Sequence, residues 1–516
     1  MLGNIFARHR QTPPAEIRMG EESAVNTETQ VKQPKKRNTK RRKLRVLFVL
    51  VMHLLGALTS IEAIMSTRTS QGAIAWGVSL NTFPYIAVPA YWALGQSKFD
   101  DYELLRRNQQ LATSESAKRA KRLLEEEQLL AIPISEEQES HARLVESLSG
   151  LPITTGNHVK LLVDGKETFD AIFDGVERAE DYILFQFYII RDDELGQRFK
   201  RVFLKKAAEG VRVYVLYDEL GSKDLSPEYI SELRGGGVEI VPFNTTKDGK
   251  RFRVNFRNHR KIVVIDGETA YVGGHNVGDE YLGLDPVLTP WRDTHVELAG
   301  PVVQCIQVPF FEDWYWATEQ RMELNWDPER AAGSDTAVAC LPTGPADLLE
   351  PGTLFFLHAI NSAQKRLWIV SPYFIPDEQI LSALQLAALR GVDVRVLIPK
   401  NPDHLHVYWS GLSYLEEAEE AGVKIFRYQP GFLHQKVWLI DDDAALVGTS
   451  NLDNRSMRLN FEIMMLVLGQ EFANEVEAML TADFEKSELA LRSEYTDRSL
   501  PFRLLVRVCR LFAPIQ

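Results

Sequence analysis

Two long apolar runs lie near the start of the chain. Residues 46–65 contain only two ionisable side chains, His53 and Glu62, and residues 72–95 contain no charged side chain. A helix needs about 20 apolar residues to cross a bilayer, and both runs reach that length. Proline is tolerated in such a span where neighbours satisfy the freed carbonyl groups. The pattern predicts two transmembrane helices within residues 46–96. The alternative is a pair of buried core helices, which are normally shorter and amphipathic.

Basic residues on both sides of these runs predict how they are oriented. Residues 1–45 hold 12 Lys or Arg and 4 Asp or Glu. The loop between the runs holds only Arg68, whereas the stretch after the second run contains Arg106, Arg107, Lys118, Arg119, Lys121 and Arg122. Cytoplasmic flanks carry the excess of Lys and Arg. We therefore predict a basic cytoplasmic tail, a hairpin that turns on the far side of the membrane, and a cytoplasmic body.

Residues 97–150 are charged and helix-prone, with leucines interspersed. They are predicted to form a helical connector. A coiled coil is the weaker alternative, because no heptad of apolar residues is sustained.

The pattern of the body repeats. Residues 178–188 and 362–373 are strand-like apolar runs that end in Tyr, and a helical stretch and a further strand follow each of them. Apolar strands alternating with helices are typical of an α/β fold. We predict two repeats, residues 151–340 and 341–490, whose mixed sheets are flanked by helices and related by a pseudo-twofold axis.

One motif occurs once in each repeat, with the pattern H-x-K-x4-D-x6-G-[GT]-x-N. The first copy contains His259, Lys261, Asp266, Gly274 and Asn276. The second contains His434, Lys436, Asp441, Thr449 and Asn451. Residues two apart on a strand share one face, so His and Lys are expected side by side. The aspartate is expected to close the strand at a turn. The glycine-containing segment lets backbone approach a ligand and brings the asparagine alongside.

Two copies of this motif at a twofold axis would form a phosphate site. Lysine and asparagine would hold the non-bridging oxygens. One imidazole can attack phosphorus, while the other protonates the leaving oxygen and then deprotonates an incoming hydroxyl. The lysines already supply positive charge, so we expect neither a metal nor another cofactor. His158 lacks this spacing and is interpreted as an ordinary strand residue.

A second set of polar residues follows the motif asparagines, about 17 residues on in the first repeat and about 9 in the second: Asp293, His295, Asn460 and Glu462. Such groups commonly orient a histidine ring. We predict that they brace the catalytic imidazoles; the alternative is that they mark structural helix or strand ends.

The net charge of the body argues against one class of partner, and the cysteine content argues against two kinds of site. After residue 45 the chain holds 47 Lys or Arg and 67 Asp or Glu, a poor match for nucleic acid. Its three cysteines are far apart and form no CxxC pair, so the sequence indicates neither a disulfide framework nor a cysteine zinc site.

The last predicted segment, residues 491–516, contains a basic stripe. Arg503, Arg507 and Arg510 fall on one helical face, and apolar residues cover the rest. This amphipathic helix suits the boundary of an anionic bilayer. The alternative is a helix packed on the body with its arginines facing solvent.

The paired motifs resemble those of the phospholipase D superfamily, and their surroundings resemble bacterial cardiolipin synthases. Four segments carry this narrower resemblance: V-G-D-E-Y at 277–281, W-R-D-T-H at 291–295, S-P-Y-F-I-P at 371–376, and F-P-Y at 83–85 within the second apolar run. The resemblance covers about residues 45–516 and is most specific at the two motifs.

This resemblance implies an enzyme of the bacterial inner membrane that transfers a phosphatidyl group between two phosphatidylglycerol molecules and releases glycerol. The intermediate would be a phosphohistidine on His259, because the first motif usually supplies the nucleophile; His434 would be the general acid and base. The alternatives are a phospholipase D-type hydrolase, a transferase that uses phosphatidylethanolamine as co-substrate, and a silent membrane scaffold. A scaffold would be expected to have lost a motif residue, and both motifs are intact.

Overall fold

A computed structural model describes residues 37–67, 69–95, 99, 102, 122–131, 136–243 and 255–516. It divides into two compact units, Met1–Leu54 and Leu55–Gln516. Most of the predicted basic tail and half of the predicted connector lie outside the described residues, as do Arg106, Arg107, Lys118, Arg119 and Lys121.

The first apolar run forms a single long helix. Helix α1 spans Arg37–Ser66. Within the described part of the chain, only its segment Lys40–Ser66 is long and apolar enough to cross a membrane, with a mean hydropathy of 2.0. The predicted apolar helix is therefore present.

The second apolar run forms two helices, α2 (Ser70–Thr82) and α3 (Pro84–Leu94), instead of the one predicted. The break lies at Phe83, with φ −131° and ψ 56°. Proline has no N–H for a helical hydrogen bond, and its ring moves the preceding residue out of the helical region. Pro84 then occupies the first position of α3, where a missing N–H costs little.

Small and polar side chains join these helices within the second unit. A Cβ atom added at Gly56 would lie 2.2 Å from the carbonyl oxygen of Leu80, so the backbones of α1 and α2 approach closely there. Asn81 Nδ2 donates to Ser60 Oγ at 3.1 Å. Small residues and interhelical hydrogen bonds are the usual contacts between helices in membranes.

The body contains one continuous sheet of 16 strands among the described residues. The first repeat contributes β1 (Thr154–Val163), β2 (Tyr182–Phe187), β3 (Arg212–Asp218), β4 (Glu239–Phe243), β6 (Ile262–Ile265), β7 (Thr269–Gly273) and β9 (Thr294–Ala299). The second contributes β10 (Thr336–Thr343), β11 (Arg366–Val370), β13 (Asp393–Pro399), β14 (Lys424–Tyr428), β16 (Val437–Ile440), β17 (Ala444–Gly448) and β19 (Asn460–Leu468).

The strand order confirms the predicted duplication. The first repeat runs β4-β3-β2-β6-β7-β9-β1 and the second runs β14-β13-β11-β16-β17-β19-β10, strand for strand. Antiparallel pairing of β1 with β10 joins the two sheets at their edges. In each repeat the outer three strands are parallel and the others antiparallel. Because β10 begins at Thr336, the predicted boundary at 340/341 falls inside this strand.

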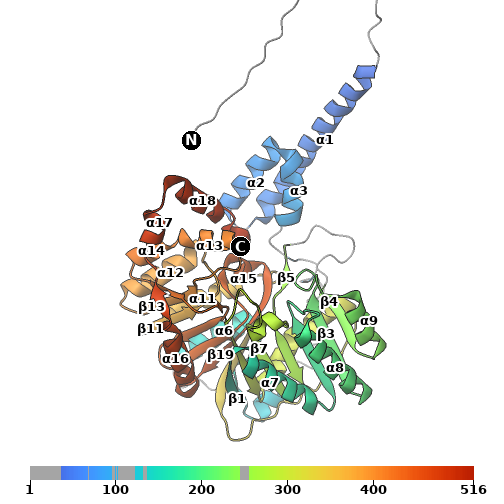
Figure 1. The fold of residues 1–516 in the computed structure, drawn as a ribbon, viewed down its shortest axis with the longest axis vertical. Helices are drawn as coiled ribbons and strands as arrows, with labels where there is room; N and C mark the ends of the chain where they lie inside the picture. The colour runs from blue at the N-terminus through green and yellow to red at the C-terminus, as the bar shows by residue number, and fades with distance from the viewer. Residues whose placement is uncertain are drawn as a thin grey trace, which may run out of the picture. The chain divides into compact units, whose positions relative to one another are not determined.

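Helices cover the sheet (Figure 1). The first repeat, largely green, carries α7 (Asp164–Arg178), α8 (Glu194–Ala208), α9 (Pro227–Gly235) and α10 (Val302–Thr318). The second, orange to red, carries α11 (Pro351–Ser362), α12 (Glu378–Leu389), α13 (Leu405–Leu412), α14 (Leu415–Glu420) and α16 (Gln470–Phe484). Helix α6 (Glu136–Ser149) precedes β1, and β20 (Ser487–Leu489), α17 (Ser493–Thr496) and α18 (Leu500–Arg510) follow α16.

Spacing of apolar residues explains how these helices pack. In α7 the buried residues Phe169, Ile172, Phe173 and Val176 lie three or four positions apart, so they form one face against the sheet. The central core draws on both repeats, because Val296 of β9 belongs to the same buried cluster as Val447 of β17 and Met465 of β19. The two repeats are therefore fixed to each other along the line where the motifs meet.

Candidate active site

A two-residue strand just before each motif holds that motif against the opposite repeat. Strand β5 (Arg257–Asn258) pairs with β19, and β15 (Phe432–Leu433) pairs with β8 (Trp291–Arg292). The backbone N–H of His259 donates to the carbonyl of Phe461 at 2.9 Å, and that of His434 donates to the carbonyl of Arg292 at 2.8 Å. Both histidines are thus brought to the pseudo-twofold axis.

A buried carboxylate of the opposite repeat holds each imidazole. His259 Nδ1 lies 2.9 Å from Glu462 Oε2, and His434 Nδ1 lies 2.7 Å from Asp293 Oδ2. An ionised carboxylate only accepts hydrogen bonds, so each Nδ1 carries the hydrogen. This tautomer leaves Nε2 available to a substrate. Asp293 and Glu462 therefore brace the imidazoles as predicted, but in a crossed arrangement that the sequence did not reveal.

Further contacts hold Glu462. Its oxygens accept from Asn460 Nδ2 at 3.1 Å and from Thr449 Oγ1 at 2.6 Å. Burial alone would raise the pKa of Glu462, but His259 and Lys261 keep it below its usual range. Glu462 is therefore held as the anion that the His259 ring requires.

Gly274 stands in the first motif where Thr449 stands in the second. It packs closely against Asp293, the carboxylate that braces His434, and makes no side-chain hydrogen bond. A Cβ atom added at Gly274 would lie 2.0 Å from Asp293 Oδ1, so only glycine leaves room for this carboxylate. The sequence assigned Gly274 and Thr449 to substrate binding. In the structure both residues contact the carboxylates that hold the histidines.

The two motif lysines are buried in the centre of the same site. Lys261 Nζ donates to the carbonyl of His259 at 2.7 Å, and Lys436 Nζ donates to the carbonyl of His434. Burial lowers the pKa of Lys261 well below its usual value and that of Lys436 to about 8, and the charge of Lys436 lowers the pKa of Lys261 further. Two cations so placed favour an anion between them.

Burial also lowers the pKa of both motif histidines. The pKa of His259 falls to about 4, where Lys261 and Lys436 add to the effect of burial and Glu462 opposes it. The pKa of His434 falls well below its usual value for the same reasons. At neutral pH His259 is therefore uncharged, as a nucleophile must be. A bound phosphodiester would raise the pKa of its neighbours and allow one ring to be protonated.

The motif asparagines make contacts within their own repeats. Asn276 Oδ1 accepts from the backbone N–H of Ile189 at 3.1 Å, and its Nδ2 donates to Tyr281 Oη at 3.1 Å. Asn451 is bonded to Asp453, and its Oδ1 is buried without a partner among the described residues. Asn276 thus fixes the chain around the site, and Asn451 retains a free acceptor.

His295 does not brace a motif histidine in this structure. Its Nδ1 lies 2.9 Å from Nδ1 of His275. Burial lowers the pKa of both rings to about 3, so they form a neutral pair. The predicted role of His295 is therefore replaced by a contact with His275.

The motif aspartates lie at the far ends of β6 and β16. Asp266 accepts from the backbone N–H groups of residues 180–182 at 2.7–2.9 Å, and Asp441 accepts from those of residues 364–366 at 2.7–3.0 Å. A strand rises about 3.3 Å per residue, so five residues separate them from the lysines by roughly 16 Å. The sequence placed both aspartates among the catalytic residues; their contacts are those of structural residues.

Replacing Asp441 with alanine is expected to lower the free energy of unfolding by about 2 kcal/mol, because three backbone N–H groups lose their acceptor. Asp441 also has φ 49°, which alanine disfavours. Thermal unfolding in detergent measures the loss, and Asp441→Asn is the control that keeps an acceptor and tolerates this φ. Lost turnover at an unchanged melting temperature would instead restore a catalytic role.

Aromatic rings at the site were not assigned from the sequence. The ring centroid of Tyr188 lies 5.1 Å from that of His259, and Trp291 lies 5.2 Å from His434. A signal for Tyr188 was present, because the repeated strand runs end in Tyr188 and Tyr373. Tyr188 and Trp291 wall the site with apolar surface, and Tyr188 also offers a hydroxyl group.

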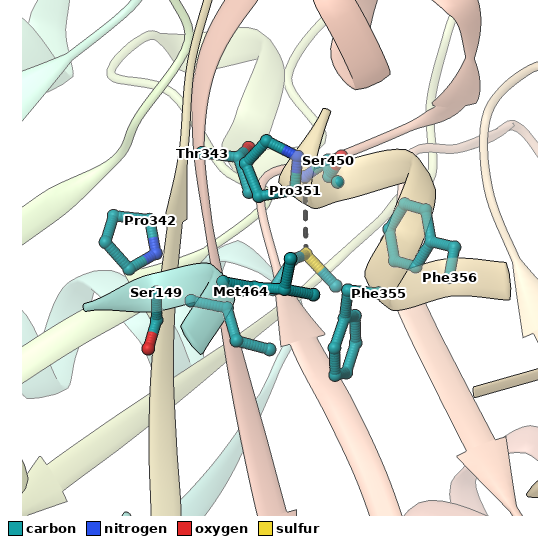
Figure 2. A pocket seen from close by; sticks show the side chains of 11 residues that line it. Ser149, Pro342, Thr343, Pro351, Phe355, Phe356, Ser450 and Met464 are labelled. Carbon is teal, nitrogen blue, oxygen red and sulfur yellow. Dashed lines mark hydrogen bonds between the residues drawn. The ribbon is translucent and has the colours of Figure 1, made fainter. Parts of the chain in front are cut away.

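A small cavity lies behind the second motif (Figure 2). Its volume of about 10 Å³ leaves room for one water molecule at most. Phe355, Pro342 and Met464 line it, and the backbone N–H of Ser450 donates to Met464 Sδ at 3.4 Å. This contact supports the segment between Thr449 and Asn451, and the cavity is too small for a substrate.

Comparisons with known proteins agree with this geometry. A family model described as "Cardiolipin synthase, PLD-like domain" matches residues 172–285 and 356–484, once in each repeat. Cardiolipin synthase A of Pseudomonas putida is 50% identical over 472 residues, which cover 90% of this chain and 96% of that protein. Cardiolipin synthase A of Pseudomonas syringae pv. syringae (strain B728a) is 48% identical over 471 residues, covering 90% and 97%.

A solved structure shares the fold. The phosphatidylserine synthase of Haemophilus influenzae Rd KW20 superimposes with a TM-score of 0.56 at 17% identity, covering 72% of this chain and 99% of that one. At this identity the likeness concerns the fold alone.

Proposed function

Because the chain belongs to the cardiolipin synthase family, whose phospholipase D-like domain it carries twice, we propose that it joins two phosphatidylglycerol molecules into cardiolipin and releases glycerol. One observation carries the proposal: two intact histidine–lysine pairs meet at one site, and each histidine is braced by a carboxylate of the other repeat. Such a site suits the transfer of a phosphate ester between two oxygen atoms.

In the first half of the reaction, the phosphate of the donor lipid lies between the lysines. An ammonium group has three donors, and each lysine gives one to a backbone carbonyl, so others remain for the phosphate oxygens. His259 Nε2 attacks phosphorus and forms a P–N bond. The P–O bond to glycerol breaks, and the protonated Nε2 of His434 gives its proton to that oxygen. Glycerol leaves, and the phosphatidyl group remains on His259.

In the second half, a second phosphatidylglycerol supplies a hydroxyl group. Nε2 of His434, now neutral, takes the hydroxyl proton while the oxygen attacks phosphorus. The P–N bond breaks, cardiolipin forms, and both histidines return to their starting states. The assignment of His259 as nucleophile rests on the family resemblance, because the bracing contacts of the two histidines are closely similar.

The test is to incubate the purified full-length protein in detergent micelles with labelled phosphatidylglycerol, with and without phosphatidylethanolamine. We expect cardiolipin and glycerol in equal amounts from phosphatidylglycerol alone. Phosphatidic acid as the sole product would identify a hydrolase. Cardiolipin formed only with phosphatidylethanolamine present would identify that lipid as co-substrate.

We also propose that the protein crosses the bacterial inner membrane twice, with its body on the cytoplasmic side. The apolar segment Lys40–Ser66 supports one span. Helices α2 and α3 would together form the second, and their contacts with the end of α1 support a hairpin. The basic residues before α1 support a cytoplasmic N-terminus.

Helix α18 presents an apolar face to solvent. Its arginines turn toward the body: Arg507 Nε donates to Tyr495 Oη at 2.9 Å and Arg510 Nη1 donates to Glu417 Oε1 at 2.6 Å. Leu504 and Leu511 are 63% and 76% exposed. This orientation is the reverse of the alternative in which the arginines face solvent. We propose that the exposed leucines insert into the membrane boundary, beside the anionic lipid that the enzyme uses.

Replacing Leu504 and Leu511 with glutamate is therefore expected to lower the rate on phosphatidylglycerol vesicles by about tenfold, because charge is costly at an apolar boundary. The rate on short-chain, monomeric phosphatidylglycerol and the melting temperature should not change. Leu389→Glu, at the exposed end of α12, is the control. A double variant that keeps its vesicle rate, or that loses thermal stability, would show that this face has another role.

A further inference from the structure

A carboxylate lies on the loop that follows β13, beside the second motif. Asp403 Oδ2 accepts from Tyr373 Oη at 2.6 Å and lies 2.9 Å from His404 Nδ1. These residues line a cavity of about 30 Å³, and the side chain of Asp403 is 20% exposed. The carboxylate is thus held in place by two donors while it remains open to a small ligand.

A side-chain contact of this loop and the strand next to Tyr373 fix Asp403 and its partner on the His434 side of the active site. Asn401 Nδ2 donates to the carbonyl of Gly431, three residues before His434, at 3.4 Å. Tyr373 directly precedes β12 (Phe374–Ile375), which pairs with β18 (Leu452–Asp453), and β18 directly follows the motif residue Asn451. The negative charge of Asp403 also opposes the fall that burial causes in the pKa of His434.

The first repeat has no carboxylate at the matched position. From the paired registers, Ser222 lies four residues past the end of β3, as Asp403 lies four residues past the end of β13. Ser222 Oγ donates to the carbonyl of Tyr188 at 3.1 Å and accepts from the N–H of Ile190 at 3.0 Å. The first repeat instead places Asp218 near Tyr188 and Lys261, but this carboxylate is buried and accepts from the backbone N–H groups of Leu220, Gly221 and Asn258. The pseudo-symmetric site is therefore asymmetric, because the carboxylate on the His434 side is partly exposed and the one on the His259 side is not.

This asymmetry matches the chemistry of the proposed function, on which the inference rests. His434 protonates the oxygen of the leaving glycerol and later deprotonates the incoming glycerol hydroxyl, so both headgroups occupy its side of the phosphorus. Each headgroup carries at least one further hydroxyl that needs an acceptor when it leaves water. A fixed carboxylate is a strong acceptor for such a group.

We propose that Asp403, positioned by Tyr373 and His404, accepts hydrogen bonds from the free hydroxyl groups of a glycerol headgroup and forms a polyol subsite beside His434. The leaving glycerol and the incoming phosphatidylglycerol use it in turn. A phosphate would be repelled by the carboxylate. An amine headgroup would be attracted, but it carries no hydroxyl for His434 to deprotonate, so it cannot be the acceptor.

The test measures what fraction of the phosphatidyl-enzyme reacts with a glycerol hydroxyl and what fraction reacts with water. The full-length enzyme in detergent micelles receives phosphatidyl-p-nitrophenol as donor, with free glycerol or phosphatidylglycerol as acceptor. Asp403→Asn is expected to lower transfer to either acceptor about tenfold relative to hydrolysis to phosphatidic acid. Release of p-nitrophenol in the first turnover should not change, because this leaving group has no hydroxyl to bind and needs little protonation.

Two variants complete the experiment. Asp443→Asn, on the exposed turn between β16 and β17, is the matched control and should divide its products as the wild type does. Asp403→Ser copies the matched residue of the first repeat, so it provides a second test if Asp403→Asn lowers the melting temperature, and the same loss of transfer is expected.

Three outcomes would contradict the inference in distinguishable ways. If both Asp403 variants keep the wild-type ratio of transfer to hydrolysis, the subsite is overturned and the proposed function stands. A loss of rate found only when phosphatidylethanolamine replaces phosphatidyl-p-nitrophenol as donor would assign Asp403 to an ammonium group instead. A wild-type enzyme that makes no cardiolipin from phosphatidylglycerol would overturn the proposed function, and the subsite with it.

Discussion

Replacement of His434 with alanine is expected to stop turnover while a labelled phosphatidyl group remains on His259. General acid and base catalysis contributes about 10²–10⁴-fold, so turnover should fall by at least that factor. His259 keeps its bond to Glu462 in this variant, and its Nε2 can still attack phosphorus slowly. The measurement is mass spectrometry of peptides after acid-free digestion, because phosphohistidine is labile in acid.

The matched variant His259→Ala should give no adduct, because the remaining histidine would have no partner in the proposed role. Both variants should keep the melting temperature of the wild type. An adduct found on His434 of the intact enzyme would reverse the two roles. The test is decisive because the bracing carboxylates make the two histidines nearly equivalent, so geometry by itself does not rank them.

The crossed bracing has a consequence for the duplicated fold. His259 needs Glu462 of the second repeat, and His434 needs Asp293 of the first. Each short strand before a motif also pairs with the opposite repeat. One repeat by itself would therefore lack the second histidine. It would also lack the carboxylate that fixes the tautomer of its own histidine.

Much of this arrangement could be predicted because the chemistry repeats in the sequence. The duplicated motif identified the histidines and lysines, and the polar residues that follow each motif asparagine included both braces, Asp293 and Glu462. The crossing could not be predicted, because it depends on β5 and β15, two-residue strands whose pairing is set by the packed core. The break at Phe83 follows from Pro84, although the apolar run alone favours one helix.

The motif aspartates show where pattern alone misleads. Asp266 and Asp441 recur with the same spacing as the catalytic residues, but repetition also preserves structural contacts. Their carboxylates bond to the backbone at the start of β2 and β11, more than 70 residues away in the sequence. Backbone donors so far away in the sequence reach the aspartates only when the sheet has formed, so the sequence pattern does not reveal them.

Replacement of Lys261 or Lys436 with alanine is expected to slow the chemical step by about 10²–10³-fold, as is usual when one transition-state donor is lost. Lys→Met variants, which keep most of the buried volume, should lose as much rate and retain the melting temperature. Lys424→Ala, at an exposed position on β14, is the control. Near-normal turnover in either alanine variant would contradict a phosphate site built from two lysines.

The pKa of Lys436 allows its charge to be tested separately from its volume. Since burial lowers this pKa to about 8, the free enzyme carries the charge below pH 8 and loses it as the pH rises through 8. The ratio kcat/KM reports ionisations of the free enzyme, so it should fall on the alkaline side with a midpoint near 8. In Lys436→Arg the guanidinium stays charged, and the alkaline fall should shift upward even though the absolute rate is lower. An alkaline midpoint that does not move in this variant would assign the titration to another group and remove Lys436 as the cation that binds phosphate.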